Sequence, residues 1–240
     1  MAKKIGFKSY CWAIGTTSYR TDNFNLSIEK QLHLLRQFRE IEENKNKKWE
    51  NNKKFQAEYY NFLKENNFVK GEAALPDKDA REKTSGLRDI GLLDDERNIT
   101  EAGLELLRIA DSANFSADNF LEIPKDSFLY FKQMLKTANV VEGKIVRPFV
   151  VFLYAVNELG YLTNDEFTYL LPLCVDEHTT KNIVKSIKNY RGTGEKNFDD
   201  IILSVLMEKD NYKQALNLLK TEPISEELIC NIGINRKSAK

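Results

Sequence analysis

The stretch GLRDIGLLDDERNITEAGLELL, residues 86–107, is the most informative pattern for the fold. Leu92 and Leu93 form a short apolar run, and the polar residues DDERN, 94–98, are typical of a tight turn. Ile99 then returns to the core, and Thr100 can cap a following helix. The order helix, strand, tight turn, strand and helix predicts a winged helix, in which the helix before the turn is the recognition helix. A winged-helix module that contacts another protein has the same local pattern and remains an alternative.

Three helices are predicted before this turn. Ser27 can cap the first, whose apolar residues recur at a spacing of three or four. The polar run at 42–54 is either a turn or an exposed helical continuation, and an aromatic-rich second helix follows it. The third helix begins at Asp77 or Asp79 and continues to Ile90. Its polar face presents the candidate DNA-binding residues Lys78, Arg81, Lys83, Thr84, Ser85 and Arg88, of which the two arginines can contact guanine in the major groove.

A second group of elements follows. A helix is predicted at 125–137, a short hairpin in VVEGKIV at 140–146, and a helix that has Pro148 in its first turn. Thr163 and Glu166 form a capping box for a further short helix.

The last predicted helices complete a helix-turn-helix-like bundle. The helix at about 178–191 carries a basic outer face, and helices near 198–208 and 211–220 follow it. We therefore predict a mainly α chain with short β-hairpins, built from tandem winged-helix or helix-turn-helix-like modules at 1–115 and 120–220. The candidate DNA-binding residues of the second module are Lys181, Lys185, Lys188 and Arg191.

Charge is balanced overall but unevenly distributed. The chain has 36 lysines and arginines and 36 aspartates and glutamates, yet residues 1–88 are basic and residues 89–180 acidic. A basic first third indicates either a surface that faces a polyanion or solvated helix faces, and charge alone leaves both open. Three cysteines and two histidines without paired spacing argue against a zinc site. The sequence shows no signal peptide and no apolar run that could span a membrane, so we expect a cytoplasmic protein without a membrane partner.

The segment before the first helix has a composition suited to phosphate contacts. It contains WAIGTTSYR, residues 12–20, in which hydroxyl groups, a glycine and an arginine can donate hydrogen bonds to phosphates. Such an arm can lie along a DNA groove beside a winged helix. An N-terminal strand whose Trp12 and Ile14 fill the core is the other interpretation. The candidate DNA-binding residues of this arm are Lys8, Thr16, Thr17, Ser18, Tyr19 and Arg20.

Three of these motifs together carry a resemblance. IGTTSYR at 14–20, TSGLRDIGLLDDERNITEAGLELL at 84–107 and RPFVVFLYAVNELGYLTNDEFTYLLPLC at 147–174 resemble the N-terminal part of AlwI-type restriction endonucleases. The resemblance implies a type IIS enzyme whose N-terminal part reads a short asymmetric site in double-stranded DNA. It also implies a separate nuclease domain or subunit that uses carboxylates and Mg²⁺, with residues 221–240 as a tail or linker toward it.

The chain itself offers only weak candidates for catalysis. Glu142-Gly143-Lys144, with Asp126 upstream, has the spacing of a nuclease motif but is better interpreted as a turn glutamate beside a lysine. Pro76-Asp77 is better interpreted as a helix start. We therefore expect no catalytic residue, metal site or cofactor in this chain, and Mg²⁺ only in the full enzyme. The alternatives are a regulatory or protein-binding winged-helix module, and a complete nuclease whose active site has no recognisable motif.

Overall fold

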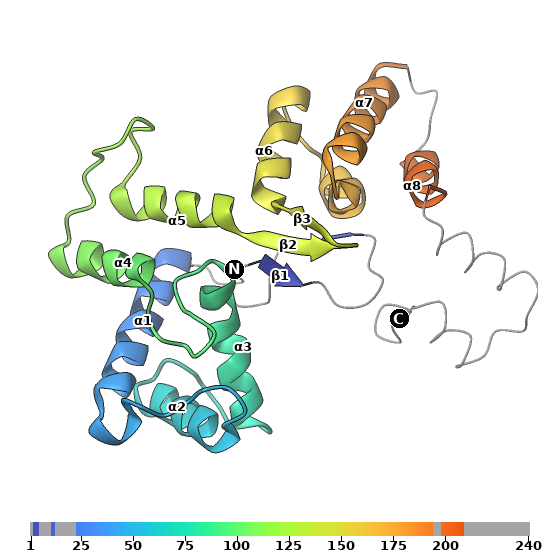
Figure 1. The fold of residues 1–240 in the computed structure, drawn as a ribbon. Coiled ribbons are helices and arrows are strands. Elements are labelled where there is room, and N and C mark those ends of the chain that lie inside the picture. The colour runs from blue at the N-terminus through green and yellow to red at the C-terminus, as the bar shows by residue number, and fades with distance from the viewer. Residues whose placement is uncertain (1, 5–10, 13–22, 194–197, 209–240) are drawn as a thin grey trace, which may run out of the picture. The chain divides into compact units, whose positions relative to one another are not determined.

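The computed structural model describes residues 2–4, 11–12, 23–193 and 198–208, which are mainly helical (Figure 1). They belong to two compact units. The first unit includes Ile14–Thr137, and the second combines Ala2–Ala13 with Ala138–Lys240. No helix in the described ranges has both the length and the apolar character needed to cross a membrane.

The first unit is a bundle of helices. Its α-helices are α1 (Phe24–Glu40), α2 (Lys53–Glu65), α3 (Pro76–Asp89), α4 (Glu101–Ser112) and α5 (Lys125–Lys136), and a 3-10 turn, η2, spans Glu42–Asn44. The apolar spacing predicted for the first helix is confirmed, because Ile28, Leu32 and Phe38 are all buried. The prediction that Ser27 caps this helix is wrong, because α1 already begins at Phe24.

An aromatic cluster forms the centre of this unit. The ring of Phe38 lies 5.1 Å from those of Phe55 and Tyr59, and Trp49 contacts the same two rings edge-on. Trp49, from the segment before α2, is only 2% exposed. This packing anchors the polar 42–54 segment to the core, so the segment is a structured connection and not a continuation of α1.

The connection between α3 and α4 follows the predicted order but with less strand. Leu93 and Ile99 form a single antiparallel bridge, where we expected two paired strands. The backbone N–H groups of Leu92 and Leu93 both donate to the carbonyl of Leu87 near the end of α3, so they do not take part in a strand ladder. Thr100 caps α4 as predicted, since its Oγ1 accepts a hydrogen bond from the backbone N–H of Gly103. The helices and the turn are therefore confirmed, while a winged helix stays a prediction.

Helix α5 packs within the first unit, although we expected it to open the second module. The ring of Tyr130 on α5 lies 5.3 Å from that of Phe24 on α1. The side chain of Gln133 donates a hydrogen bond to the carbonyl of Ile90 at 3.0 Å. These contacts with segments earlier in the chain attach α5 to the first unit.

The second unit combines a small sheet with helices. Its strands are β1 (Ala2–Lys4), β2 (Ala138–Val141) and β3 (Lys144–Val146), in the order β1-β2-β3. Strands β1 and β2 are parallel, and β2 and β3 form the predicted hairpin. Glu142 and Gly143 make its turn with positive φ angles of 50° and 77°.

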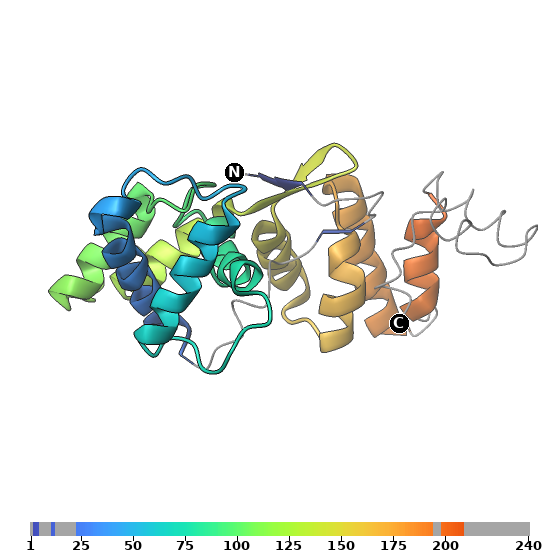
Figure 2. The ribbon, with the colours of Figure 1, turned by 90° about the horizontal axis from the view of Figure 1, so that it is seen from below.

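Helical segments follow the hairpin. They are α6 (Pro148–Leu159), a π-helical turn η3 (Glu166–Leu170), a 3-10 turn η4 (Leu171–Leu173), α7 (Glu177–Thr193) and α8 (Phe198–Leu206). Helix α7 lies beside both α6 and α8 (Figure 2). The predicted capping box is present, because the backbone N–H of Thr163 donates to Glu166 and that of Glu166 donates to Thr163 Oγ1.

Trp12 belongs to the core of the second unit. It is 3% exposed, its indole Nε1 donates to the carbonyl of Cys174 at 3.1 Å, and its backbone N–H donates to the carbonyl of Pro172. The interpretation of Trp12 as a core residue is confirmed. Ile14 lies outside the described residues.

Candidate nucleic-acid interface

A cationic cleft lies in the first unit, between α2, α3, the segment before α2 and the 94–98 turn. Its volume is about 780 Å³. It is lined by Trp49, Glu50, Asn51, Lys53, Gln56, Arg81, Arg88, Asp95 and Arg97. Two of these residues, Arg81 and Arg88, are the α3 arginines that the sequence analysis selected. The structure thus places both of them on one concave surface with cations from two other segments.

Both α3 arginines already have carboxylate partners. Arg81 Nη1 lies 2.8 Å from Asp77 Oδ2, one turn earlier on α3, and also donates to Gln56. The hydrogen bond from Arg81 lowers the pKa of Asp77. Arg88 Nη2 lies 3.1 Å from Asp89 Oδ1. Their guanidinium groups are therefore oriented, and part of their charge is neutralised, before any ligand binds.

The other selected residues of α3 differ in their availability. Lys83 is exposed, and so is Lys78, which lies 3.7 Å from Glu82. Ser85 is half-buried and its hydroxyl donates to the carbonyl of Glu82. These three residues can be reached from solvent.

Thr84 was wrongly placed on the exposed face. Its side chain is fully buried, donates to the carbonyl of Ala80 at 2.9 Å, and accepts a hydrogen bond from Arg97 Nε at 3.0 Å. A threonine is small enough to enter the core once its hydroxyl is satisfied, and helical spacing alone does not show this. Thr84 therefore orients Arg97 and does not face a ligand.

Arg97 also lines the cleft, although the sequence did not predict it as a binding residue. It lies in the turn between Leu93 and Ile99 and is 5% exposed. Its guanidinium lies over the Trp49 ring, 5.7 Å from the centroid, and Nη1 donates to the carbonyl of Asp95 at 2.9 Å. Among the described residues, Arg97 forms no ion pair with a carboxylate and Nη2 contacts no acceptor.

The surroundings of Arg97 are costly for a cation. Burial, reinforced by the nearby charge of Arg88, lowers the pKa of Arg97 to about 10. Its backbone is left-handed, with φ at 61°, a conformation that glycine or asparagine adopts more easily. A turn of this kind gives no sequence signal for an arginine that faces a cleft, because the contacts come from Trp49 and Thr84, far from it in the chain.

Lys53 completes the cationic lining and was also missed. It is the first residue of α2, is exposed, and forms no ion pair with the described residues. In the sequence it is one lysine in a run of polar residues, and nothing there separates it from its neighbour Lys54. Only Lys53 lines the cleft.

The basic face predicted for α7 is mostly neutralised in the second unit. Lys181 forms an ion pair with Glu177, and Lys188 Nζ lies 2.8 Å from Glu158. Lys185 is exposed, and no ion pair holds it among the described residues.

Arg191 is a structural residue of this unit. It forms a bidentate ion pair with Glu166, with distances of 2.9 and 2.5 Å, and donates to the carbonyls of Leu159 and Tyr161. Its guanidinium also lies 4.0 Å from the centre of the Tyr161 ring. We therefore withdraw Arg191 as a residue that awaits DNA, since its donors are already used to hold the segment before η3 against α7.

The arm residues that we predicted to bind DNA lie outside the described part of the chain. These are Lys8, Thr16, Thr17, Ser18, Tyr19 and Arg20.

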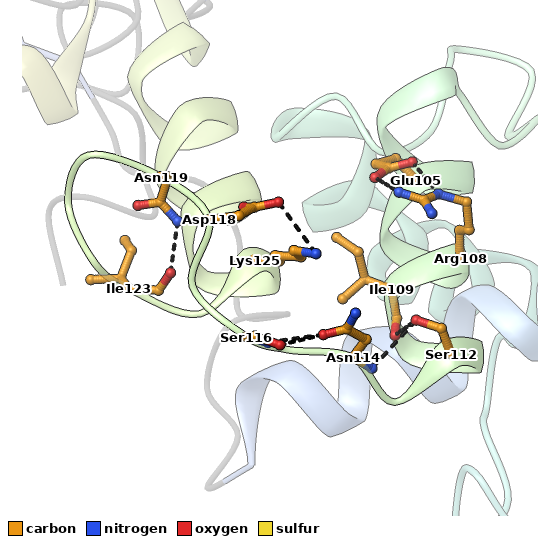
Figure 3. Close-up of polar contacts among 10 residues, drawn as sticks. All are labelled: Glu105, Arg108, Ile109, Ser112, Asn114, Ser116, Asp118, Asn119, Ile123 and Lys125. Carbon is orange, nitrogen blue, oxygen red and sulfur yellow. Dashed lines mark hydrogen bonds and ion pairs between the residues drawn. The ribbon is translucent and has the colours of Figure 1, made fainter.

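A second polar cluster occupies the loop between α4 and α5 and is closed on itself (Figure 3). Lys125 Nζ lies 3.2 Å from Asp118, and Asn119 donates to the carbonyl of Ile123 at 2.7 Å. Arg108 forms a two-pronged contact with Glu105. The contacts of Asp118 and Asn119 order the loop, whereas Arg108 and Glu105 pair within α4. Since these groups satisfy one another, the cleft is the better interface candidate.

The candidate nuclease triplet has the local structure of a turn. Glu142 and Gly143 form the β2–β3 turn, and Lys144 pairs with Asp176. Within the described ranges there is no group of three or more histidine, cysteine, aspartate or glutamate side chains arranged to hold a metal ion. Pro76 begins α3, so the interpretation of Pro76-Asp77 as a helix start is confirmed.

The described residues thus define a mainly helical protein of two units with a cationic cleft in the first. Residues 88–231, more than half of the chain, match the sequence profile of the AlwI restriction endonuclease. The chain belongs to the AlwI restriction endonuclease family. Comparison with curated proteins and with solved structures gave no significant match. The matched range begins at Arg88, so it includes the 94–98 turn and the whole described second unit from Ala138 onward.

Proposed function

We propose that this chain recognises a specific sequence in duplex DNA as the recognition part of a type IIS restriction endonuclease. The observation that carries the proposal is the cationic cleft, where four cations from three segments converge beside α3. Family membership supports DNA as the partner. Neutral or cationic ligands would gain little from such a surface, whereas a DNA backbone carries one negative charge per ~1.7 Å of helix axis.

The chemistry of the side chains determines which of them we assign to bases and which to phosphates. Arg81 and Arg88, which pair with Asp77 and Asp89, would contact guanine edges, since arginine pairs with guanine through two hydrogen bonds. The exposed Lys78, Lys83 and Ser85 would contact phosphates beside the same groove. In this arrangement α3 is the recognition helix.

Other parts of the chain have supporting roles in this proposal. The 14–20 segment is a phosphate-contacting arm, and Lys181, Lys185 and Lys188 of α7 form a weaker second contact. The two compact units, divided between Thr137 and Ala138, act as two recognition modules in place of the expected 1–115 and 120–220, and 221–240 leads toward a nuclease domain or subunit. Phosphodiester hydrolysis with Mg²⁺ belongs to that nuclease part, and the cytoplasm is the expected location.

A selection experiment tests the function and does not require that the DNA site be known. The purified chain is used to select duplexes from a library with a randomised central region over several rounds, and the enriched pool is sequenced. We expect one short asymmetric motif, with affinity for it at least about tenfold above that for a random duplex. Enrichment without a motif would limit the function to nonspecific DNA binding. No retention of duplex at low salt would favour the protein-binding alternative.

Cleavage is measured in the same preparation. Plasmid that contains the selected motif is incubated with the chain and Mg²⁺ or Mn²⁺, and we expect no cutting. Cleavage that is lost in Lys144→Ala would show that the Glu142–Lys144 turn is catalytic after all, and would replace the proposal of a recognition part by that of a complete nuclease.

A further inference from the structure

We propose that Arg97 and Lys53 form a preformed phosphate clamp that holds one backbone phosphate of duplex DNA at the cleft, separate from base recognition by α3. This inference rests on the proposed DNA-binding function but concerns two residues outside α3. It assigns to the 94–98 turn and to the start of α2 the task of fixing the position of the duplex.

The charge balance of the cleft singles out these two residues. Four cations and two carboxylates, Glu50 and Asp95, line it. Arg81 and Arg88 are paired with Asp77 and Asp89 as described above. Arg97 and Lys53 are therefore the lining cations that form no ion pair with the described residues, and they supply the charge that an anion would neutralise.

Two features make the position of Arg97 energetically unfavourable. A nearly buried guanidinium without an ion pair is costly, and a left-handed backbone adds strain for a residue other than glycine. The protein offsets this cost with three fixed contacts, to Thr84, to the Asp95 carbonyl and to the Trp49 ring. All three orient the guanidinium and leave Nη2 available for an acceptor.

A further donor at the same cleft lacks a partner. The indole Nε1 of Trp49, which lines the cleft, is buried and makes no hydrogen bond with the described residues. An unsatisfied buried donor is rare in a folded protein and calls for an explanation. This indole N–H is buried, so the groups that the cleft itself offers to an anion are Nη2 of Arg97 and the exposed ammonium group of Lys53.

Phosphate is the anion that fits this set of donors. A guanidinium presents planar, forked N–H groups that match the oxygens of a phosphate, and a lysine adds a mobile point charge. The cleft also contains Arg81 and Arg88 of α3, to which the proposed base contacts are assigned. A phosphate held there would fix the register of α3 on the duplex without contributing to sequence choice.

The test uses two variants and a closely matched control. Lys53→Gln removes the exposed cation of the clamp, and Lys54→Gln removes its neighbour, which is equally exposed but does not line the cleft. Arg97→Asn removes the guanidinium and retains a residue that tolerates the left-handed backbone. Arg97→Lys keeps a positive charge at the same position.

Binding of the full chain to the selected duplex and to a random duplex is titrated at several salt concentrations. We expect Lys53→Gln and Arg97→Asn each to weaken binding to both duplexes by the same factor. Each should also reduce the slope of log affinity against log salt by about 1. Lys54→Gln should keep the slope of the natural protein. Arg97→Lys should retain most of the slope.

A second measurement uses inorganic phosphate as the probe, detected by isothermal calorimetry in a buffer without other polyvalent anions. Weak phosphate binding that is lost in Lys53→Gln but kept in Lys54→Gln supports the clamp. If the chain binds phosphate in this way but no duplex, the pocket serves a free anion and the proposed DNA function fails.

The outcomes separate the two proposals. If the natural protein selects a DNA motif while Lys53→Gln and Lys54→Gln behave alike, the clamp is wrong and the DNA-binding function stands. A larger loss on the selected duplex than on the random one would make Arg97 a base-contacting residue and would also overturn the clamp. If Arg97→Asn does not fold, as judged by its melting curve, the comparison of Lys53→Gln with Lys54→Gln tests the clamp.

Discussion

Helices α3 and α7 carry similar basic faces in the sequence, yet their cations are in different situations. Most of the cations on both helices pair with carboxylates: Lys181, Lys188 and Arg191 on α7, and Lys78, Arg81 and Arg88 on α3. The difference is that α3 borders a cleft to which other segments bring Arg97 and Lys53. The comparison shows that a row of lysines and arginines at helical spacing does not identify a binding surface by itself. The positions of the carboxylates decide how much of the charge remains for a ligand.

The largest effect that we expect concerns the stability of the second unit. Arg191→Ala should lower the free energy of unfolding by about 3–5 kcal/mol, because it leaves the carboxylate of Glu166, with a side chain only 3% exposed, without its partner. Chemical denaturation with a probe in the second unit, such as Trp12 fluorescence, measures the change.

Lys188→Ala is the control for this prediction. Its ion pair with Glu158 is largely exposed, and such pairs contribute only about 0–1 kcal/mol. Equal losses in the two variants would show that the difference in burial between these ion pairs has no energetic consequence.

A smaller but more specific effect is expected on α3. Arg81→Ala and Arg88→Ala should each weaken binding to the selected duplex by about 1–3 kcal/mol, if each contacts a base. Binding to random duplex should change much less, because a lost base contact does not alter nonspecific attraction. Competition titrations with both duplexes measure the two losses side by side.

Two results would contradict the role of α3. Equal losses on both duplexes would make the arginines phosphate contacts, and no loss on either would remove α3 as the recognition helix. Gln56→Met tests the orientation of Arg81, since it keeps the side-chain volume and removes an acceptor of that arginine.

The stability of the second unit should depend on pH in the acid range, because of the buried ion pair between Arg191 of α7 and Glu166. Burial alone would raise the pKa of Glu166, but hydrogen bonds from Arg191 and from Thr163 outweigh it and hold the pKa below the ordinary 4.5. A carboxyl group with a lowered pKa in the folded state stabilises the protein above its unfolded pKa, and this contribution is lost as the pH falls through the folded value. We therefore expect unfolding midpoints of the second unit to fall as the pH drops below about 4.5.

Glu166→Gln is the matching variant for the acid experiment. It should be less stable at neutral pH, since an amide cannot replace the ion pair, and its stability should depend less on pH in the acid range. Part of the dependence will remain, because Lys144 and Thr179 hold the pKa of Asp176 low despite its partial burial. Parallel pH curves for the two proteins would mean that Glu166 does not titrate in this range.

The smallest expected effect is that of α7 on DNA binding. Lys188→Gln should change affinity by less than about twofold, because Glu158 already neutralises the lysine. Lys185→Gln should weaken binding more, since Lys185 forms no ion pair with the described residues. A salt titration compares the two variants directly, and a larger loss in Lys188→Gln would show that DNA displaces the glutamate.

Features that depend on neighbouring residues were predictable from the sequence. The helix that contains Ile28, Leu32 and Phe38 follows from apolar spacing, and the caps at Thr100 and Thr163 follow from side-chain chemistry. The Glu142-Gly143 turn is equally local. These structures form because a few consecutive residues favour them, whatever the rest of the chain does.

Predictions about long-range contacts succeeded less well. Thr84 was expected on the surface and is buried, because Arg97, thirteen positions away, donates to its hydroxyl. The expected strands beside the 94–98 turn are reduced to one bridge, because the backbone N–H groups of Leu92 and Leu93 donate to the carbonyl of Leu87 near the end of α3. The family motif itself was visible, and the match over residues 88–231 covers two of the three stretches that carried it, although the first of these begins four residues earlier.

The sequence by itself determined the helices of the described residues, the caps at Thr100 and Thr163, the hairpin and the family, while the helix predicted near 211–220 lies outside the described residues. Only the tertiary structure decided which cations remain without a carboxylate. Lys53 and Lys54 are indistinguishable in sequence, and Arg97 is one polar residue in an acidic turn. Their difference arises when Trp49, α2, α3 and the turn pack around one cleft. Ion pairing and burial depend on distances between segments far apart in the chain, and local sequence patterns do not contain those distances.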